Sequence, residues 1–183
     1  MARDTRTRIL DTALALFVSR GVEGVAVTEI EQGAGLSPGS GSFYRHFRSK
    51  ADVLDAVVAR EIDRAVAARV VPGEGDLASE YARALAGLDA IGSLLALLVR
   101  DGSRLPHRAR LREVLAETGT HLDAERLQAR MDAGEIPARD AEAVASVVQL
   151  ALVGHHLARR FFGGPLGVDE ARFVAALASL VER

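Results

Sequence analysis

Apolar residues recur every three or four positions along most of the chain, a spacing that places them on one face of an α-helix. Between positions 5 and 20, for example, this spacing is followed by Ile9, Leu10, Ala13, Leu14, Leu16 and Phe17. No stretch alternates apolar and polar residues between turn signals, as strands would. The pattern therefore predicts an all-α protein with about nine helices.

Glycine, proline and short polar residues divide this pattern into segments. We expect helices at about 5–20, 28–34, 42–47, 49–71, 77–88, 92–100, 106–133, 140–162 and 168–182. Capping-box spacing relates Thr28 to Glu31 and Ser49 to Asp52. The start of the third helix stays open, because it can begin at Ser37 or only after Gly39.

The first three expected helices have the logic of a helix-turn-helix, in which the second helix of a close pair enters the major groove of DNA. Ile30 and Ala34 lie four positions apart and face the core. Gly35 allows the sharp turn, and Leu36 packs back between the helices. The sequence thus predicts a DNA-binding domain at 1–50 and a ligand-binding and dimerisation domain at 51–183, linked by the helix at 49–71.

Polar and basic side chains gather in this turn and the helix after it. The charged residues between positions 36 and 50 are Arg45, Arg48 and Lys50, the only lysine of the chain. Serine hydroxyls can donate to phosphate or base edges, and glycine lets the backbone approach DNA closely. The net charge is −2, which argues against a protein that coats nucleic acid generally. The local positive cluster on such a protein instead predicts a local phosphate contact. On charge alone, chance clustering stays an equal alternative.

The runs at 34–37 and 41–54 resemble the DNA-binding signature of the TetR/AcrR family, and the helix containing Arg8–Leu10, Leu16–Phe17 and Gly21 resembles its first helix. The resemblance covers about 6–58. It implies a repressor that contacts DNA through Thr28, Ser42, Tyr44, His46 and Lys50. The chemistry of the turn and of the basic cluster adds Ser37, Ser40, Gly41 and Arg45 as candidate contacts. We expect Phe43 and Phe47 to face the core instead.

The chain departs from the family signature between the turn serine and the tyrosine. The usual spacing is shorter by two residues, so 38–41 looks like an expanded turn. This puts base-reading roles for Ser37 to Ser40 in doubt, whereas the assignments of Tyr44 and Lys50 do not depend on it.

The helix at 141–154 is apolar around nearly its whole circumference, so we expect it to be buried on every side. A domain this small covers one side, and a second subunit is expected to cover the other. The last helix adds a second apolar face. The expected homodimer interface comprises Val144, Val147, Val148, Ala151, Gly154, Phe173, Leu177 and Leu180. An entirely intramolecular core helix is the alternative.

The other helices of this domain are candidates to enclose a small-molecule effector. Such sites are mostly apolar with a few polar groups. The candidate pocket residues are Tyr81, Leu88, Leu95, Leu98, Leu111, Leu115, His121 and His155. For each of them, ordinary core packing is the competing interpretation.

Several classes of function are disfavoured. The chain has no cysteine, its histidines do not repeat at a ligand spacing, and no catalytic constellation appears, so we expect no metal, no cofactor and no enzyme. No apolar stretch approaches the length of a membrane span, and no signal peptide is evident, which predicts a cytoplasmic protein without a membrane partner.

The function predicted is a regulator that occupies a palindromic double-stranded DNA operator as a dimer and is released by an unidentified small molecule. Two alternatives stay open. One is a helical protein that binds a small molecule but no longer reads DNA, and the other is an activator of the same family.

Overall fold

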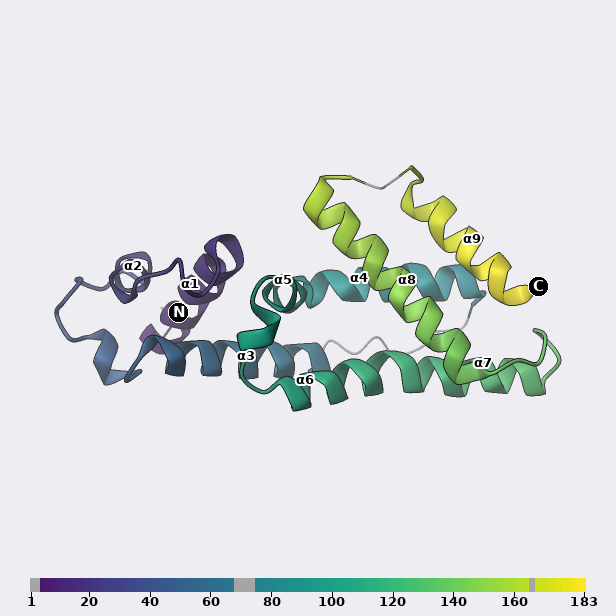
Figure 1. Cartoon of the computed structure of the whole chain (residues 1–183), viewed down its shortest axis with the longest axis horizontal. Helices are drawn as coiled ribbons and strands as arrows, with labels where there is room; N and C mark the ends of the chain where they lie inside the picture. The colour runs from purple at the N-terminus through teal and green to yellow at the C-terminus, as the bar shows by residue number, and fades with distance from the viewer. Residues whose placement is uncertain (1–3, 68–74, 165–166) are drawn as a thin grey trace. The chain divides into compact units, whose positions relative to one another are not determined.

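The computed structural model describes residues 4–67, 75–164 and 167–183, and this part of the chain contains nine α-helices and no strand (Figure 1). The all-α expectation is confirmed. The helices are α1 (Thr5–Arg20), α2 (Val27–Gly33), α3 (Lys50–Ala67), α4 (Leu77–Ala90), α5 (Gly92–Asp101), α6 (Arg108–Leu115), α7 (Leu122–Asp132), α8 (Ala141–Phe162) and α9 (Glu170–Glu182).

The chain forms two compact units. The first contains Met1–Ala65 and Ile91–Leu111, and the second contains Val66–Ala90 and Arg112–Arg183. Most of α3 and all of α5 thus belong to the first unit. The functional boundary near residue 50 stays a prediction, because contacts alone do not say which residues bind DNA.

In the first unit, α1 packs against α2 and α5. The buried face of α1 carries Ile9, Leu10, Ala13 and Phe17, in agreement with its expected periodicity. A Cβ atom at Gly33 of α2 would lie 2.6 Å from Cγ2 of Thr12, so glycine at this position permits the close approach of the two helices.

The helix ends in the first unit follow the sequence pattern only in part. The Gly21 N–H donates to the Phe17 carbonyl over 2.8 Å and ends α1 as expected. The capping box expected from Thr28 and Glu31 is wrong, because α2 begins at Val27 and Glu29 accepts the Ala26 N–H instead.

The second capping box is confirmed for the Ser49 side chain, whereas the Asp52 carboxylate accepts the N–H of the residue before Ser49. Ser49 Oγ accepts the Asp52 N–H over 3.1 Å, and the Asp52 carboxylate accepts the Arg48 N–H over 3.0 Å. Two backbone donors at the start of α3 are thereby satisfied reciprocally, which fixes the entry into this helix.

The helix expected at 106–133 is helical throughout most of its length but changes its winding. A π-helical stretch, Ala116–His121, joins α6 to α7 directly. The helix begins at Arg108 because His107 before it has a φ of 58°, outside the helical region. Three poor helix formers, Thr118, Gly119 and Thr120, lie in the π-helical stretch.

In the second unit, α8 packs against α4 and α7, and α9 packs against α4 (Figure 1). Aspartates cap both C-terminal helices: Asp140 accepts the Ala143 N–H and Asp169 accepts the Arg172 N–H. The core of this unit includes Leu77, Leu85, Leu127, Ala145, Val148, Leu152, Val174, Leu177 and Val181.

Helix α8 is long and apolar enough, by length and composition alone, to cross a membrane, which the sequence analysis did not anticipate. Core helices of proteins without any membrane also have these properties. Because α8 includes Gln149, His156 and Arg159 and packs against two other helices, we interpret it as a packing helix.

Candidate DNA interface

The segment after α2 consists of an extended turn (residues 36–41) followed by a short recognition segment (Ser42–His46). A single 3₁₀ turn, Phe43–Arg45, is its only assigned helix, although Ser42 and His46 also have helical backbone angles. The expected recognition helix at 42–47 is therefore only about one turn long. It begins after Gly41, which settles the start that the sequence left open.

Two glycines shape the extended turn. Gly39 and Gly41 have φ values of 76° and 75°. Residues other than glycine adopt this left-handed backbone conformation only at a cost in free energy. A Cβ atom at either position would meet nothing within 4 Å. The requirement for glycine here thus comes from the backbone conformation, and the open side leaves room for a DNA backbone.

Phe43 and Phe47 fix the recognition segment to the first unit. Both side chains are buried, and their ring centroids lie 6.1 Å apart. Arg6 of α1 places its guanidinium 5.0 Å from the centre of the Phe47 ring. The expectation that these two aromatic residues face the core is confirmed.

The other side of the segment faces solvent. Tyr44 is 59% exposed, and its ring packs edge-on against Phe43 at 5.3 Å. Arg45 and His46 are exposed beside it. Among the remaining expected contacts, Ser37, Ser40 and Thr28 are exposed, and Gly41 and Ser42 are half-buried.

Lys50 is also half-buried, but its ammonium group already has protein partners. Nζ donates to the carbonyls of Val22 and Val25, each over 2.9 Å. An ammonium has three donors, so one remains for a phosphate. The side chain therefore ties the α1–α2 connector to the start of α3, in addition to any role on DNA.

Glu29, the partly exposed acid of α2, is neutralised by an ion pair with Arg20. Arg20 donates to Glu29 over 2.8 Å, and this hydrogen bond, together with that from the Ala26 N–H, lowers the pKa of the Glu29 carboxyl. Since the recognition segment contains no acid of its own, this surface suits an anionic partner.

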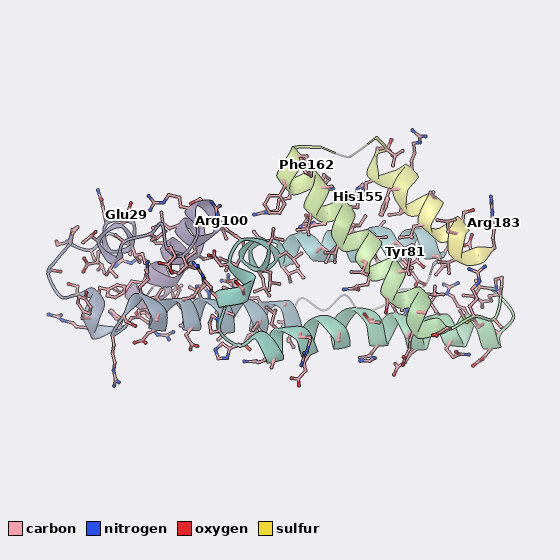
Figure 2. The ribbon with its side chains drawn as sticks, viewed as in Figure 1. Glu29, Tyr81, Arg100, His155, Phe162 and Arg183 are labelled. Atoms are coloured by element: carbon pink, nitrogen blue, oxygen red, sulfur yellow. The ribbon has the colours of Figure 1, made fainter. Side chains whose placement is uncertain are left out.

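Sequence reasoning missed two residues that hold the first unit in shape. Glu31 of α2 is buried and accepts the Gly39 N–H. Arg100 of α5 donates to the carbonyls of Val18 and Ser19 at the end of α1 (Figure 2). Their partners are backbone groups in other elements, so no local pattern could have identified either contact.

A small pocket lies within the second unit, with room for about one water molecule. Its walls combine apolar and charged side chains from α4, α7 and α8. They are Leu77, Glu80, Tyr81, Asp123, Arg126, Leu127, Arg130 and Val148. The i, i+3, i+7 spacing of Asp123, Arg126 and Arg130 was available in the sequence as a sign of one shared helix face.

The pocket's charges are largely paired. Arg126 contacts Glu80 and Asp123, and Arg130 contacts Glu80 over 2.7 Å. Burial raises the pKa of Asp123 despite the neighbouring arginine, and it raises the pKa of Tyr81 strongly. The Tyr81 hydroxyl is buried and has no hydrogen-bond partner within the described residues.

Among the described residues, Tyr81 is the one expected pocket residue that lines this cavity. Figure 2 labels its position on α4. Leu88 packs on the core of the same unit, His155 stacks on Phe173, and His121 is exposed. The leucines at 95, 98 and 111 belong to the first unit. The side chain of Leu115 lies outside the described residues.

The expected dimer residues divide into two groups. Val148 and Leu177 are buried in the core of the second unit. Val144, Ala151 and Phe173 are partly buried against that core, whereas Val147, Gly154 and Leu180 are exposed. The exposed members continue along α8 through Leu150 and Phe161, which the sequence analysis did not select.

A helical pair with a turn, an inward aromatic anchor and an outward polar segment defines a helix-turn-helix DNA-binding protein. The family model for bacterial regulatory proteins of the tetR family matches residues 9–57. The transcriptional regulator UidR of Escherichia coli (strain K12) is 30% identical over 140 residues, covering 74% of this chain and 70% of that protein. The chain belongs to the TetR family of transcriptional regulators.

Other relatives agree with this assignment. The transcriptional repressor KstR2 of Rhodococcus jostii (strain RHA1) is 35% identical over 94 residues, 51% of this chain and 39% of that protein. A transcriptional regulator from Saccharomonospora viridis, solved in complex with choline, has a TM-score of 0.75 at 21% identity and covers 97% of this chain and 98% of its own. This second likeness shows the fold.

Proposed function

We propose that this protein is a homodimeric repressor that occupies a palindromic operator in the cytoplasm and leaves it when a small molecule binds the second unit. The observation that carries the proposal is the recognition segment. It is anchored through buried Phe43 and Phe47 and presents Tyr44, Arg45 and His46 to solvent.

The exposed members of the segment suit contacts to DNA. Tyrosine and serine hydroxyls, imidazole and guanidinium groups all donate to phosphate oxygens, and arginine can also read guanine in the major groove. We assign these contacts to Thr28, Ser37, Ser40, Gly41, Ser42, Tyr44, Arg45, His46 and the free donor of Lys50.

The pocket around Tyr81 supports an effector site in the second unit. Its unpartnered hydroxyl is a donor that a ligand acceptor would satisfy, and the paired charges around it would rearrange around a polar guest. The choline complex of the Saccharomonospora viridis regulator supports a small polar effector. A ligand larger than water requires the pocket to open, which would couple binding to a change of conformation.

The test is a gel-shift titration of the purified protein on the promoter region of its own gene, repeated over a range of salt. We expect a specific complex whose affinity falls steeply with salt, because phosphate contacts release counterions. Absence of a specific complex at moderate salt would refute the proposal.

One observation favours the rival function, a helical protein that binds a small molecule but no longer reads DNA. The turn before the recognition segment is two residues longer than in the family signature, and the helical part is only about one turn long. If this alternative is correct, the protein should bind the promoter and unrelated DNA with equal affinity.

A further inference from the structure

Glu31 is a buried carboxylate in the middle of the DNA-binding unit. Its side chain is 2% exposed. Oε2 accepts the Gly39 N–H over 3.0 Å, while Oε1 is buried without a hydrogen-bond partner. Burying a carboxylate with a single hydrogen-bond partner costs free energy of folding. We therefore expect Glu31 to contribute something that offsets this cost.

The partner of Glu31, the Gly39 N–H, belongs to the extended turn that follows the C-terminus of α2. Within the described residues, this is the one side-chain hydrogen bond that joins the turn to α2. Two backbone hydrogen bonds also hold the turn: the Leu36 N–H donates to the Glu31 carbonyl of α2 over 2.8 Å, and the Ser40 N–H donates to the Ser37 carbonyl over 3.1 Å. Glu31 therefore links the turn to the protein core.

The link continues into the recognition segment. Ser40, directly after Gly39, has its Oγ 2.7 Å from Oγ of Ser42, and it also accepts the Ser42 N–H over 3.4 Å. Ser42 directly precedes the 3₁₀ turn and itself has helical backbone angles. The hydrogen bonds at Gly39 and at Ser40, joined by the peptide bond between these two residues, thus connect the buried carboxylate to the start of the recognition segment.

We infer that Glu31 is a positioning residue for operator recognition: it holds the extended turn in one conformation, so that Ser40 and Ser42 reach the duplex as a second reading element beside Tyr44. The inference rests on the proposed function, since it concerns how the same interface reads DNA. It gives the two additional turn residues a purpose, because a recognition helix of one turn presents few side chains by itself.

The physical reason is preorganisation. A turn with two flexible glycines would otherwise lose conformational entropy on binding DNA. Contacts to phosphate by arginine and lysine do not need the turn in one conformation, so non-specific binding is expected to be independent of Glu31. The anchor thus acts on the difference between operator and non-operator DNA.

The experiment compares Glu31→Leu and Glu31→Gln with the wild type on operator DNA and on a scrambled duplex. The glutamine oxygen can still accept the Gly39 N–H, whereas leucine cannot. We expect leucine to weaken operator binding about 10-fold or more, and glutamine to stay within about 3-fold, with little change on scrambled DNA for either.

Glu61 supplies the matched control, since it is a similarly buried carboxylate in the same unit but pairs with Arg60 and Arg64. Glu61→Gln and Glu61→Leu test whether loss of any buried acid has the same effect. A leucine variant at position 31 that binds the operator as the wild type does, or that loses both DNAs equally, would overturn the inference.

A second measurement uses only the wild type and does not depend on whether a variant folds. The Gly39 amide should exchange with solvent more slowly than an unbonded loop amide in the free protein. Unprotected exchange at Gly39 would overturn the inference even with operator binding intact. Failure of the wild type to prefer its operator would instead refute the proposed function.

Discussion

At the scale of single residues, Lys50 and Tyr44 differ in what they do for the folded protein. The Lys50 ammonium satisfies two carbonyls of the α1–α2 connector. The exposed Tyr44 has no hydrogen-bond partner for its hydroxyl within the described residues. The resemblance to the family implies DNA contact for both, but only the polar group of Lys50 also makes hydrogen bonds within the described part of the protein.

The two roles separate in substitutions. Lys50→Ala should lower the free energy of unfolding by about 1–3 kcal/mol, because two carbonyls lose a charged donor. Tyr44→Phe should leave that free energy unchanged, since it removes only an exposed hydroxyl. Both should weaken DNA binding. Urea unfolding and DNA titration of the two variants measure this, and an unaltered stability of Lys50→Ala would contradict the role given to its hydrogen bonds.

His156 makes the stability of the second unit depend on pH. Burial lowers the pKa of its imidazole, against the opposing effect of Asp89. The unfolded chain then takes up a proton at a higher pH than the folded protein does. The free energy of unfolding should therefore fall as the pH drops below about 6.5 and level off below the lowered pKa.

The measurement is urea unfolding of the wild type and His156→Gln between about pH 5 and pH 8. Glutamine does not titrate, so the part of the pH dependence due to this residue should disappear. Parallel stability profiles for the two proteins would show that His156 does not contribute.

At the scale of elements, the sequence predicted the long helices well and the recognition element poorly. Helices such as α1 and α8 repeat their apolar pattern over several turns, and the repeat identifies both the helix and its buried face. The recognition segment has one inward residue, Phe43, and a second, Phe47, follows it directly, so the pattern could not show how few residues around them are helical.

The site was predictable where it depended on residue type and spacing in the chain. That information was enough for the exposed side of the recognition segment and for its inward aromatic residues. It was not enough for Glu31, Lys50 or Arg100, whose partners are backbone groups brought close by folding. The charged pocket around Glu80 needed the pairing of α4 with α7 and α8 for the same reason.

Helix capping gives a prediction for single elements. Asp140 and Asp169 accept backbone N–H groups over 3.0 Å and 2.9 Å at the starts of α8 and α9. Replacing either with alanine should lower the free energy of unfolding by about 1 kcal/mol. Glu142→Ala, in the first turn of α8 but not at the cap, is the control and should cost at most about 0.5 kcal/mol. Equal losses at 140 and 142 would contradict the capping role.

At the scale of the whole molecule, α8 carries an apolar stripe that the described part of the chain leaves exposed. It comprises Val147, Leu150, Gly154 and Phe161, which share one helix face, and Val147 and Leu150 are 64% and 71% exposed. Of the most apolar part of α8, only 28% is buried within the chain. A second copy of α8 would cover the stripe, and Gly154, with nothing near its missing Cβ, would allow close helix contact.

Leu150→Arg should therefore convert a dimer into a monomer, because the interface would have to bury an unpaired charge. Leu150 is exposed and lies outside the core formed by the described residues, so the variant should keep its helix content. Val99→Arg on α5, where the original side chain is 57% exposed but lies outside the stripe, is the matched control and should remain a dimer. Sedimentation equilibrium measures the mass of each.

On operator DNA, the affinity of the monomer should show roughly half the salt dependence of that of the dimer, because the monomer contacts half as many phosphates. A dimeric Leu150→Arg would mean that the subunits meet through another surface.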